Sequence, residues 1–144
     1  MSIVEKLKAE AIALRKSRNP IAPSIQFALS EIEKVGKNNG NRETTEDEAI
    51  KVVQKLIATV NENIRFATES NDDGRLVALN FEKRILESTL PQMASDDDVR
   101  VYLKNSFVEA PQNKGVAMKV LKAKFGALVD MKRAGEIITE MYGV

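Results

Sequence analysis

The chain has 144 residues, of which 43% are hydrophobic and 30% charged, and it carries a formal net charge of +1 with neither cysteine nor histidine. The absence of both residue types excludes a thiol nucleophile, a disulfide framework, an imidazole base and the usual zinc sites. Because the total charge is near neutral, the protein as a whole is not attracted electrostatically to nucleic acid or to a membrane surface. Any such attraction must come from a local cluster of charges.

The glycines and the apolar runs indicate neither a nucleotide site nor a membrane segment. None of the glycines falls in a G-x-G-x-x-G or G-x-x-x-x-G-K-[ST] pattern, so we expect no nucleotide cofactor. The segment 1–14 is interrupted by charged residues, among them Glu5 and Lys8, which argues against a spanning helix or a secretory signal. We therefore expect a cytoplasmic protein with no membrane partner.

Apolar residues recur at spacings of three and four rather than two, which predicts an all-α fold of seven helices. The first helix is expected over 2–17, where Ser2 and Glu5 form a capping box. The second helix is expected over 20–35, with Gly36 as its stop.

A third, long helix is predicted to open at Thr45, which forms a second capping box with Glu48. Its apolar stripe consists of Ile50, Val53, Ile57, Val60 and Ile64. The polar run 71–74 breaks the chain, and a fourth helix is expected over 75–90.

Three more helices are predicted toward the C-terminus. One starts after Ser95, with Asp98 at the capping-box position, and continues to Phe107. The next covers 113–125, and the last is capped by Asp130. Because a proline and a short connector precede Ser95, we predict a four-helix N-terminal part, residues 1–91, and a three-helix C-terminal part, residues 92–144.

The acidic clusters have a structural explanation that we prefer to a catalytic or metal-binding one. Residues 96–98 are three aspartates in the first turn of a helix, where negative charge complements the macrodipole. The run 71–74 lacks the spaced ligands of a calcium loop. The remaining carboxylates lie at turns or on polar helix faces, so we predict no metal site and no catalytic residue.

The segment 112–135 is locally basic, with a single acidic residue, Asp130. Its cations are Lys114, Lys119, Lys122, Lys124, Lys132 and Arg133. On a helical wheel Val116, Ala117, Val120, Leu121 and Phe125 form one apolar arc, and Lys119 and Lys122 point away from it. They would face solvent or a partner.

Lys132 and Arg133 stand in the first turn of the last helix, where positive charge opposes the macrodipole. Free N–H groups at that helix start, beside two cations, would suit a phosphate. Phosphate contacts give affinity without reading sequence, so the implied ligand is a folded nucleic acid recognised by its shape. The alternative is that these are ordinary solvated cations, which are unexceptional at this density.

Several stretches resemble the YqeY-like family, in order along nearly the whole chain. The run 44–50, TTEDEAI, followed by Val53-Gln54-Lys55, resembles the acidic-capped third helix of that family. The stretch from Gly74-Arg75 to Leu90-Pro91 resembles the one that ends in its Tyr-Leu-Pro signature, and 114–118, KGVAM, resembles its Met-Gly-Lys-Val-Met segment. The chain departs from the family at Ile25-Gln26, Thr89 and 128–131.

The resemblance implies an all-helical fold shared with the tail of the GatB subunit of the tRNA-dependent amidotransferase, a glutamine-dependent carbon–nitrogen ligase. It implies a tRNA or an amidotransferase as partner, with residues 92–144 as the tail-like subdomain and without catalysis by this chain alone. The nucleic-acid-binding candidates are Lys114, Lys119, Lys122, Lys132, Arg133 and, in the Gly-Arg turn, Arg75. Two other readings remain: a helical module that binds a partner protein, and a free-standing C–N ligase.

Overall fold

The computed structural model describes all residues from Met1 to Val144, and its fold is all-α, as predicted. The seven helices are α1 (Ile3–Lys16), α2 (Ala22–Asn38), α3 (Glu46–Glu69), α4 (Asp73–Thr89), α5 (Asp96–Ser106), α6 (Lys114–Phe125) and α7 (Met131–Tyr142). A short 3-10 turn, η1 (Gly126–Leu128), joins α6 to α7. No helix combines the length and the apolar character that a membrane crossing requires.

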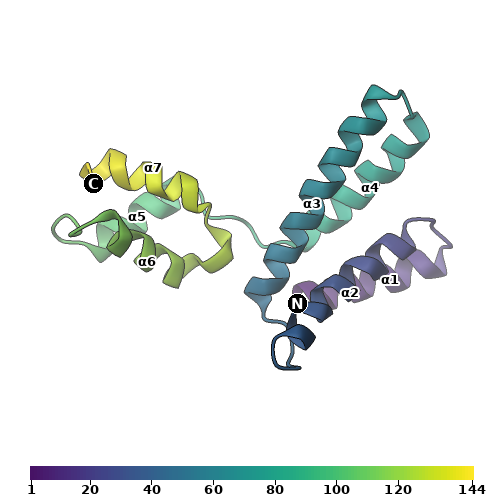
Figure 1. Cartoon of the computed structure of the whole chain (residues 1–144), viewed down its shortest axis with the longest axis horizontal. Coiled ribbons are helices and arrows are strands. Elements are labelled where there is room, and N and C mark those ends of the chain that lie inside the picture. The colour runs from purple at the N-terminus through teal and green to yellow at the C-terminus, as the bar shows by residue number, and fades with distance from the viewer. The chain divides into compact units, whose positions relative to one another are not determined.

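The chain divides into two compact units, Met1–Leu90 and Pro91–Val144. The first unit consists of two helical hairpins, in which α1 packs against α2 and α3 packs against α4. Figure 1 shows these hairpins meeting near the N-terminus and diverging toward their tips. α1 contacts both α3 and α4, and α2 contacts α3, so one core joins the two hairpins.

The core of the first unit is built from the apolar stripes of its helices. The predicted stripe positions Ile50, Val53 and Val60 are buried, whereas Ile57 and Ile64 are half-buried. Its fully buried larger side chains are Ile3, Leu7, Ile25, Ile32, Val53 and Leu86. Burying a side chain of this size contributes about 1.5–3 kcal/mol to the free energy of folding. The capping boxes predicted at the starts of α1 and α3 are both present.

The prediction that Gly36 ends the second helix was wrong, because α2 continues to Asn38. Gly36 instead lets the following loop pack onto the helix. Its N–H donates to Thr44 Oγ1 at 3.0 Å, and its carbonyl accepts from the N–H of Arg42 at 3.0 Å. A Cβ at this position would overlap the carbonyl oxygen of Arg42. The glycine is therefore required for close approach rather than for helix termination.

α4 begins at Asp73, two residues before the predicted start, and ends at Thr89. Thr89, which stands where the family signature has tyrosine, is 1% exposed and is the only buried polar side chain in the chain. Its hydroxyl donates to the carbonyl of Leu86 at 2.7 Å, and its own carbonyl accepts from Lys6 Nζ at 3.5 Å. Its polar groups are thus satisfied inside the core.

The second unit is a bundle in which each of α5, α6 and α7 contacts the other two. Its core consists of Val99, Leu103, Ala117, Leu121, Val129, Ala134, Ile137 and Ile138. The Ser95–Asp98 capping box opens α5 as predicted, and the side chain of Asn113 caps α6. Of the apolar arc predicted on α6, Val116 is exposed, so its place on the buried face was wrong.

Candidate nucleic-acid interface

The outer face of α6 carries cations that no carboxylate neutralises. α6 contains four lysines and no acidic residue. Lys119 and Lys122 are exposed, and neither forms an ion pair. They stand at i and i+3, which places their side chains side by side on the helix surface. Because Ala117 and Leu121 fix the opposite face in the core, these two lysines are held toward solvent.

Lys114 and Lys132 lie on the side where α6 meets α7. The Cε atom of Lys114 lies so close to Gly135 that a methyl group there would be 3.1 Å away. Lys132 is three residues before Gly135 and therefore shares that side of α7. Both lysines are exposed and without an ion pair, so this side is basic as well.

Lys124 serves a packing role beside its charge. Its Nζ lies 5.7 Å from the ring centroid of Tyr102 on α5, in a cation–π contact. Tyr102 in turn packs edge-on against Phe125, with ring centroids 5.6 Å apart. Sequence reasoning placed Lys124 near the apolar arc, and its stem does cross toward the neighbouring helix.

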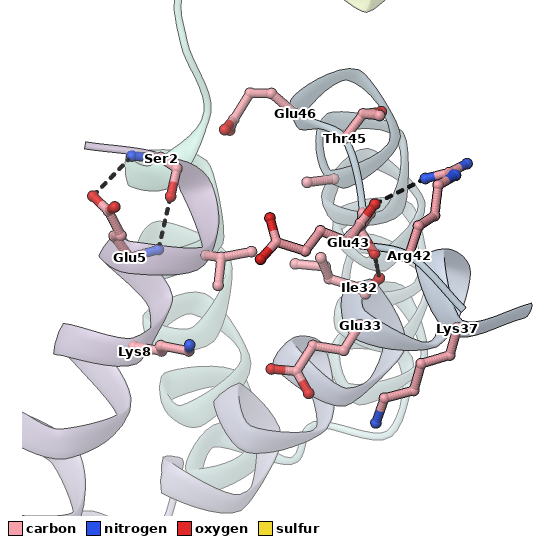
Figure 2. Close-up of a pocket in the computed structure, with 13 residues that line it drawn as sticks. Ser2, Glu5, Lys8, Ile32, Glu33, Lys37, Arg42, Glu43, Thr45 and Glu46 are labelled. Carbon is pink, nitrogen blue, oxygen red and sulfur yellow. Dashed lines mark hydrogen bonds between the residues drawn. The ribbon is translucent and has the colours of Figure 1, made fainter. Parts of the chain in front are cut away.

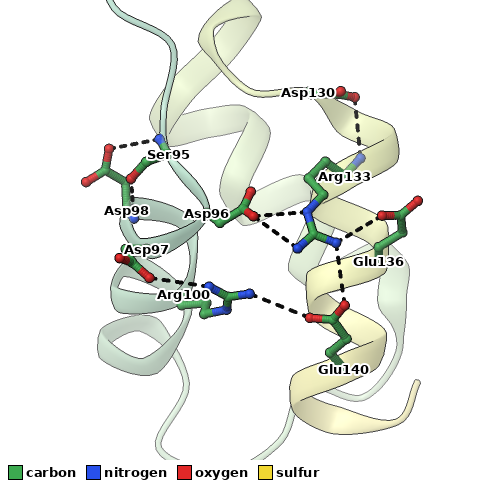
Figure 3. Close-up of polar contacts among 9 residues, drawn as sticks. All are labelled: Ser95, Asp96, Asp97, Asp98, Arg100, Asp130, Arg133, Glu136 and Glu140. Atoms are coloured by element: carbon green, nitrogen blue, oxygen red, sulfur yellow. Dashed lines mark hydrogen bonds and ion pairs between the residues drawn. The ribbon is translucent and has the colours of Figure 1, made fainter.

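Arg133 belongs to an ion-pair network between α5 and α7, which Figure 3 shows. Its Nε and Nη2 donate to Asp96 Oδ2 at 3.1 and 3.0 Å. Its Nη1 donates to Glu136 at 3.0 Å and to Glu140 at 3.4 Å. Arg100 of α5 extends the network, at 3.7 Å from Glu140 and 3.3 Å from Asp97.

The network carries more negative than positive charge. Hydrogen bonds from Arg133 lower the pKa of Asp96, and Asp96 and Glu136 raise that of the Arg133 guanidinium. The guanidinium of Arg133 is therefore paired with carboxylates of the protein itself. The paired residues of the network all lie on α5 and α7, and none of them belongs to α6.

The structure bears on two of the sequence-based expectations at the start of α7. Arg133, predicted as a phosphate contact, is surrounded by three carboxylates, which would repel a polyanion. The helix start beside it was also predicted to have free N–H groups. Asp130 Oδ1 accepts from the N–H groups of Lys132 and Arg133 at 3.0 and 3.4 Å, so these two donors are occupied.

Arg75, the remaining candidate, lies in the first unit rather than in the second. It stands in the first turn of α4, and its N–H donates to Asp72 Oδ1 at 3.2 Å. Glu69, Asp72 and Asp73 all lie within six residues of it at this hairpin tip. The structure therefore does not bring Arg75 together with the other candidates in one unit, and its surroundings are acidic.

A hollow of about 520 Å³ in the first unit was not predicted from the sequence. It lies between the start of α1, the second half of α2 and the loop that leads into α3, and residues of both charge signs line it (Figure 2). Several of its polar groups serve the fold: Glu46 accepts from the N–H of Ile3 at 2.9 Å, and Arg42 donates to Glu48 at 2.7 Å. Arg42 and the backbone of Thr45 hold the pKa of Glu48 at about 2.

No group of three or more acidic side chains is placed to hold a metal ion. A family model described as Yqey-like protein matches residues 3–142. The match begins at the first residue of α1 and ends at the last residue of α7, so it includes both units. No curated protein matches the chain.

Proposed function

The chain belongs to the YqeY-like family, and on that premise we propose that it is a cytoplasmic accessory protein that binds tRNA, alone or together with a tRNA-dependent amidotransferase. In this proposal residues 92–144 are the tail-like subdomain that contacts the RNA. In this proposal the amide transfer itself is carried out by the amidotransferase and not by this chain alone.

One observation carries the proposal: α6 presents exposed lysines with no carboxylate paired to them, while the arginines of the same unit are paired. Lys119 and Lys122 form the centre of this basic face, and Lys114 and Lys132 extend it toward α7. Cations that are not neutralised release counterions from a phosphate backbone when they bind it, whereas neutralised cations contribute little.

The aromatic residues of the second unit favour recognition of the RNA backbone over stacking with bases. Tyr102 packs against Phe125, and Phe107 packs against Tyr142 with ring centroids 6.5 Å apart. All four rings are half-buried against the core, so part of each ring is already covered by packing, whereas a stacking platform needs exposed rings. A backbone-reading surface fits a folded RNA that is recognised by its contour.

Recovery of RNA and protein bound to a tagged chain in cells tests this proposal. We expect small structured RNA to copurify with the wild-type chain and to be lost from the Lys119→Glu/Lys122→Glu variant. The matched control is Lys51→Glu/Lys55→Glu, which reverses two exposed lysines of α3 that form no ion pair. Capture of a partner protein in a salt-insensitive manner, without RNA, would contradict the proposal and favour a protein-interaction module.

A further inference from the structure

The tip of the α1–α2 hairpin is a second unpaired basic surface, and it lies in the first unit. Arg15, Lys16 and Arg18 are exposed and take part in no ion pair. The segment from Ala11 to Ser30, which includes the end of α1 and the start of α2, contains no aspartate or glutamate. This tip therefore concentrates positive charge in a protein whose net charge is only +1.

Helix-end chemistry explains only part of this charge. Arg15 and Lys16 occupy the last turn of α1, where cations complement the macrodipole. Arg18 lies beyond that helix, four residues before the first residue of α2, in a left-handed backbone conformation with φ of 55°. The first turn of α2 has no acidic residue, although acidic residues are favoured there. The positive end of the α2 dipole thus adds to the field of the three cations.

The other hairpin of the same unit ends with charge of the opposite sign. The α3–α4 tip includes Glu69, Asp72 and Asp73, and all three carboxylates are exposed. The two hairpins diverge toward these tips (Figure 1), so the first unit has a basic end and an acidic end that are separate from each other. An extended anion that contacts this unit would be attracted to the first and repelled by the second.

We propose that the α1–α2 tip is a second RNA-binding surface, at which Arg15, Lys16 and Arg18 contact backbone phosphates. The inference rests on the proposed function for the identity of the polyanion. Arginine is suited to this role because its planar guanidinium binds phosphate oxygens in a bidentate manner. Arg15 also borders a shallow hollow with Ala22, Pro23 and Gln26, which leaves its head group accessible from the α2 side.

An anionic membrane fits this tip less well. A helix that lies on a membrane combines its cations with an apolar stripe that enters the lipid. The apolar stripe of α1, consisting of Ile3, Leu7, Ala11 and Leu14, is buried in the protein core. Ile12 and Phe27 are exposed, but they lie on different helices, α1 and α2, and not along one face of a single helix.

Binding of a mixture of purified tRNA to the full-length chain, measured at several salt concentrations, tests the inference. We expect Arg15→Glu/Arg18→Glu to lower the affinity about tenfold or more and to reduce the salt slope by about two, one for each lost phosphate contact. Arg15→Gln/Arg18→Gln, which is milder for the end of α1, should show the same change of slope. Lys51→Glu/Lys55→Glu serves as the control for charge alone.

Photo-crosslinking locates the contact directly. A benzophenone amino acid in place of Gln26, beside Arg15, should crosslink to the RNA, whereas the same probe in place of Glu69 at the acidic tip should not. Unchanged binding by the tip variants, with loss of binding by Lys119→Glu/Lys122→Glu, would overturn this inference and leave the proposed function in place. Loss in the tip variants alone would support the inference and contradict the role of α6. Arginine-dependent flotation with phosphatidylglycerol vesicles, and no RNA binding, would overturn both.

Discussion

Arg133 on α7 donates two hydrogen bonds to a single oxygen of Asp96 on α5, at 3.1 and 3.0 Å, and so joins the two helices. Its chain neighbour Lys132 is exposed and forms no ion pair. The side chains of consecutive helical residues are about 100° apart around the axis, which separates these two cations onto different sides of α7. One therefore has a structural role, and the other is available to a ligand.

Arg133→Gln and Lys132→Gln should consequently change different properties, the first the stability of the fold and the second the affinity for RNA. We expect Arg133→Gln to lower the midpoint of urea unfolding, because Asp96, Glu136 and Glu140 lose their shared cation. Lys132→Gln should leave that midpoint unchanged and weaken RNA binding. Circular dichroism and a binding titration on both variants measure this difference. Equal loss of RNA affinity in the two variants, with no change in stability, would contradict the assignment.

The ion pair between Arg42 and Glu48 predicts a pH-dependent contribution to stability. The pKa of Glu48 is held at about 2, below its ordinary 4.5, first by the hydrogen bond from Arg42. A carboxyl group whose pKa is lowered in the folded state stabilises the protein at pH values above its ordinary pKa. This stabilisation is lost as the pH falls from about 4.5 to about 2. Arg42→Gln should thus be less stable than wild type at neutral pH but equally stable at the acid end of that range. Lys34→Gln, which removes an unpaired cation, should show no such pH dependence.

Gly36 and Gly74 are both helical, and alanine at the two positions should have opposite effects. At Gly36 a Cβ would overlap the carbonyl oxygen of Arg42 and come within 2.7 Å of the Thr44 nitrogen, so we expect a loss of about 1–3 kcal/mol. At Gly74 the nearest atom is 3.9 Å away, and alanine should stabilise the protein by about 0.4–1 kcal/mol. Urea unfolding of the two variants gives both values, and a stable Gly36→Ala protein would show that the loop does not pack as described.

The core of the second unit should depend strongly on Leu121. This side chain is 0% exposed and lies opposite the basic face of α6. Leu121→Ala should destabilise the unit by about 2–5 kcal/mol, because it leaves a cavity among Leu103, Ala117 and Ile137. Val108→Ala, at a fully exposed position, should have little effect on unfolding. A small effect at Leu121 would mean that α6 is not held by this core.

The fold was largely predictable because its signals are local. The capping boxes that open α1, α3 and α5 involve residues only three apart, and the apolar stripes repeat within single helices. The exception at Gly36 has a non-local cause, since the loop that packs onto this glycine follows it by six to eight residues. A glycine near a helix end is compatible with either role.

The candidate site was predictable only for residues whose position depends on their own helix and not on a partner from another helix. Spacing on α6 was sufficient to place Lys119 and Lys122 on the solvent face. Asp96 and Arg133 are 37 residues apart, so no sequence pattern indicated that they would pair. The spacing of Arg133, Glu136 and Glu140 along one side of α7 was a signal that could have indicated its neutralisation.

The salt dependence of tRNA binding tests the central claim most directly, since it counts the phosphate contacts that α6 supplies. Each lysine that contacts a phosphate contributes about one unit to the slope of log K against log salt concentration. We predict that Lys119→Glu/Lys122→Glu lowers this slope by about two and that Arg133→Gln leaves it unchanged. An unchanged slope in the α6 double variant, or wild-type tRNA binding that does not respond to salt, would contradict the account.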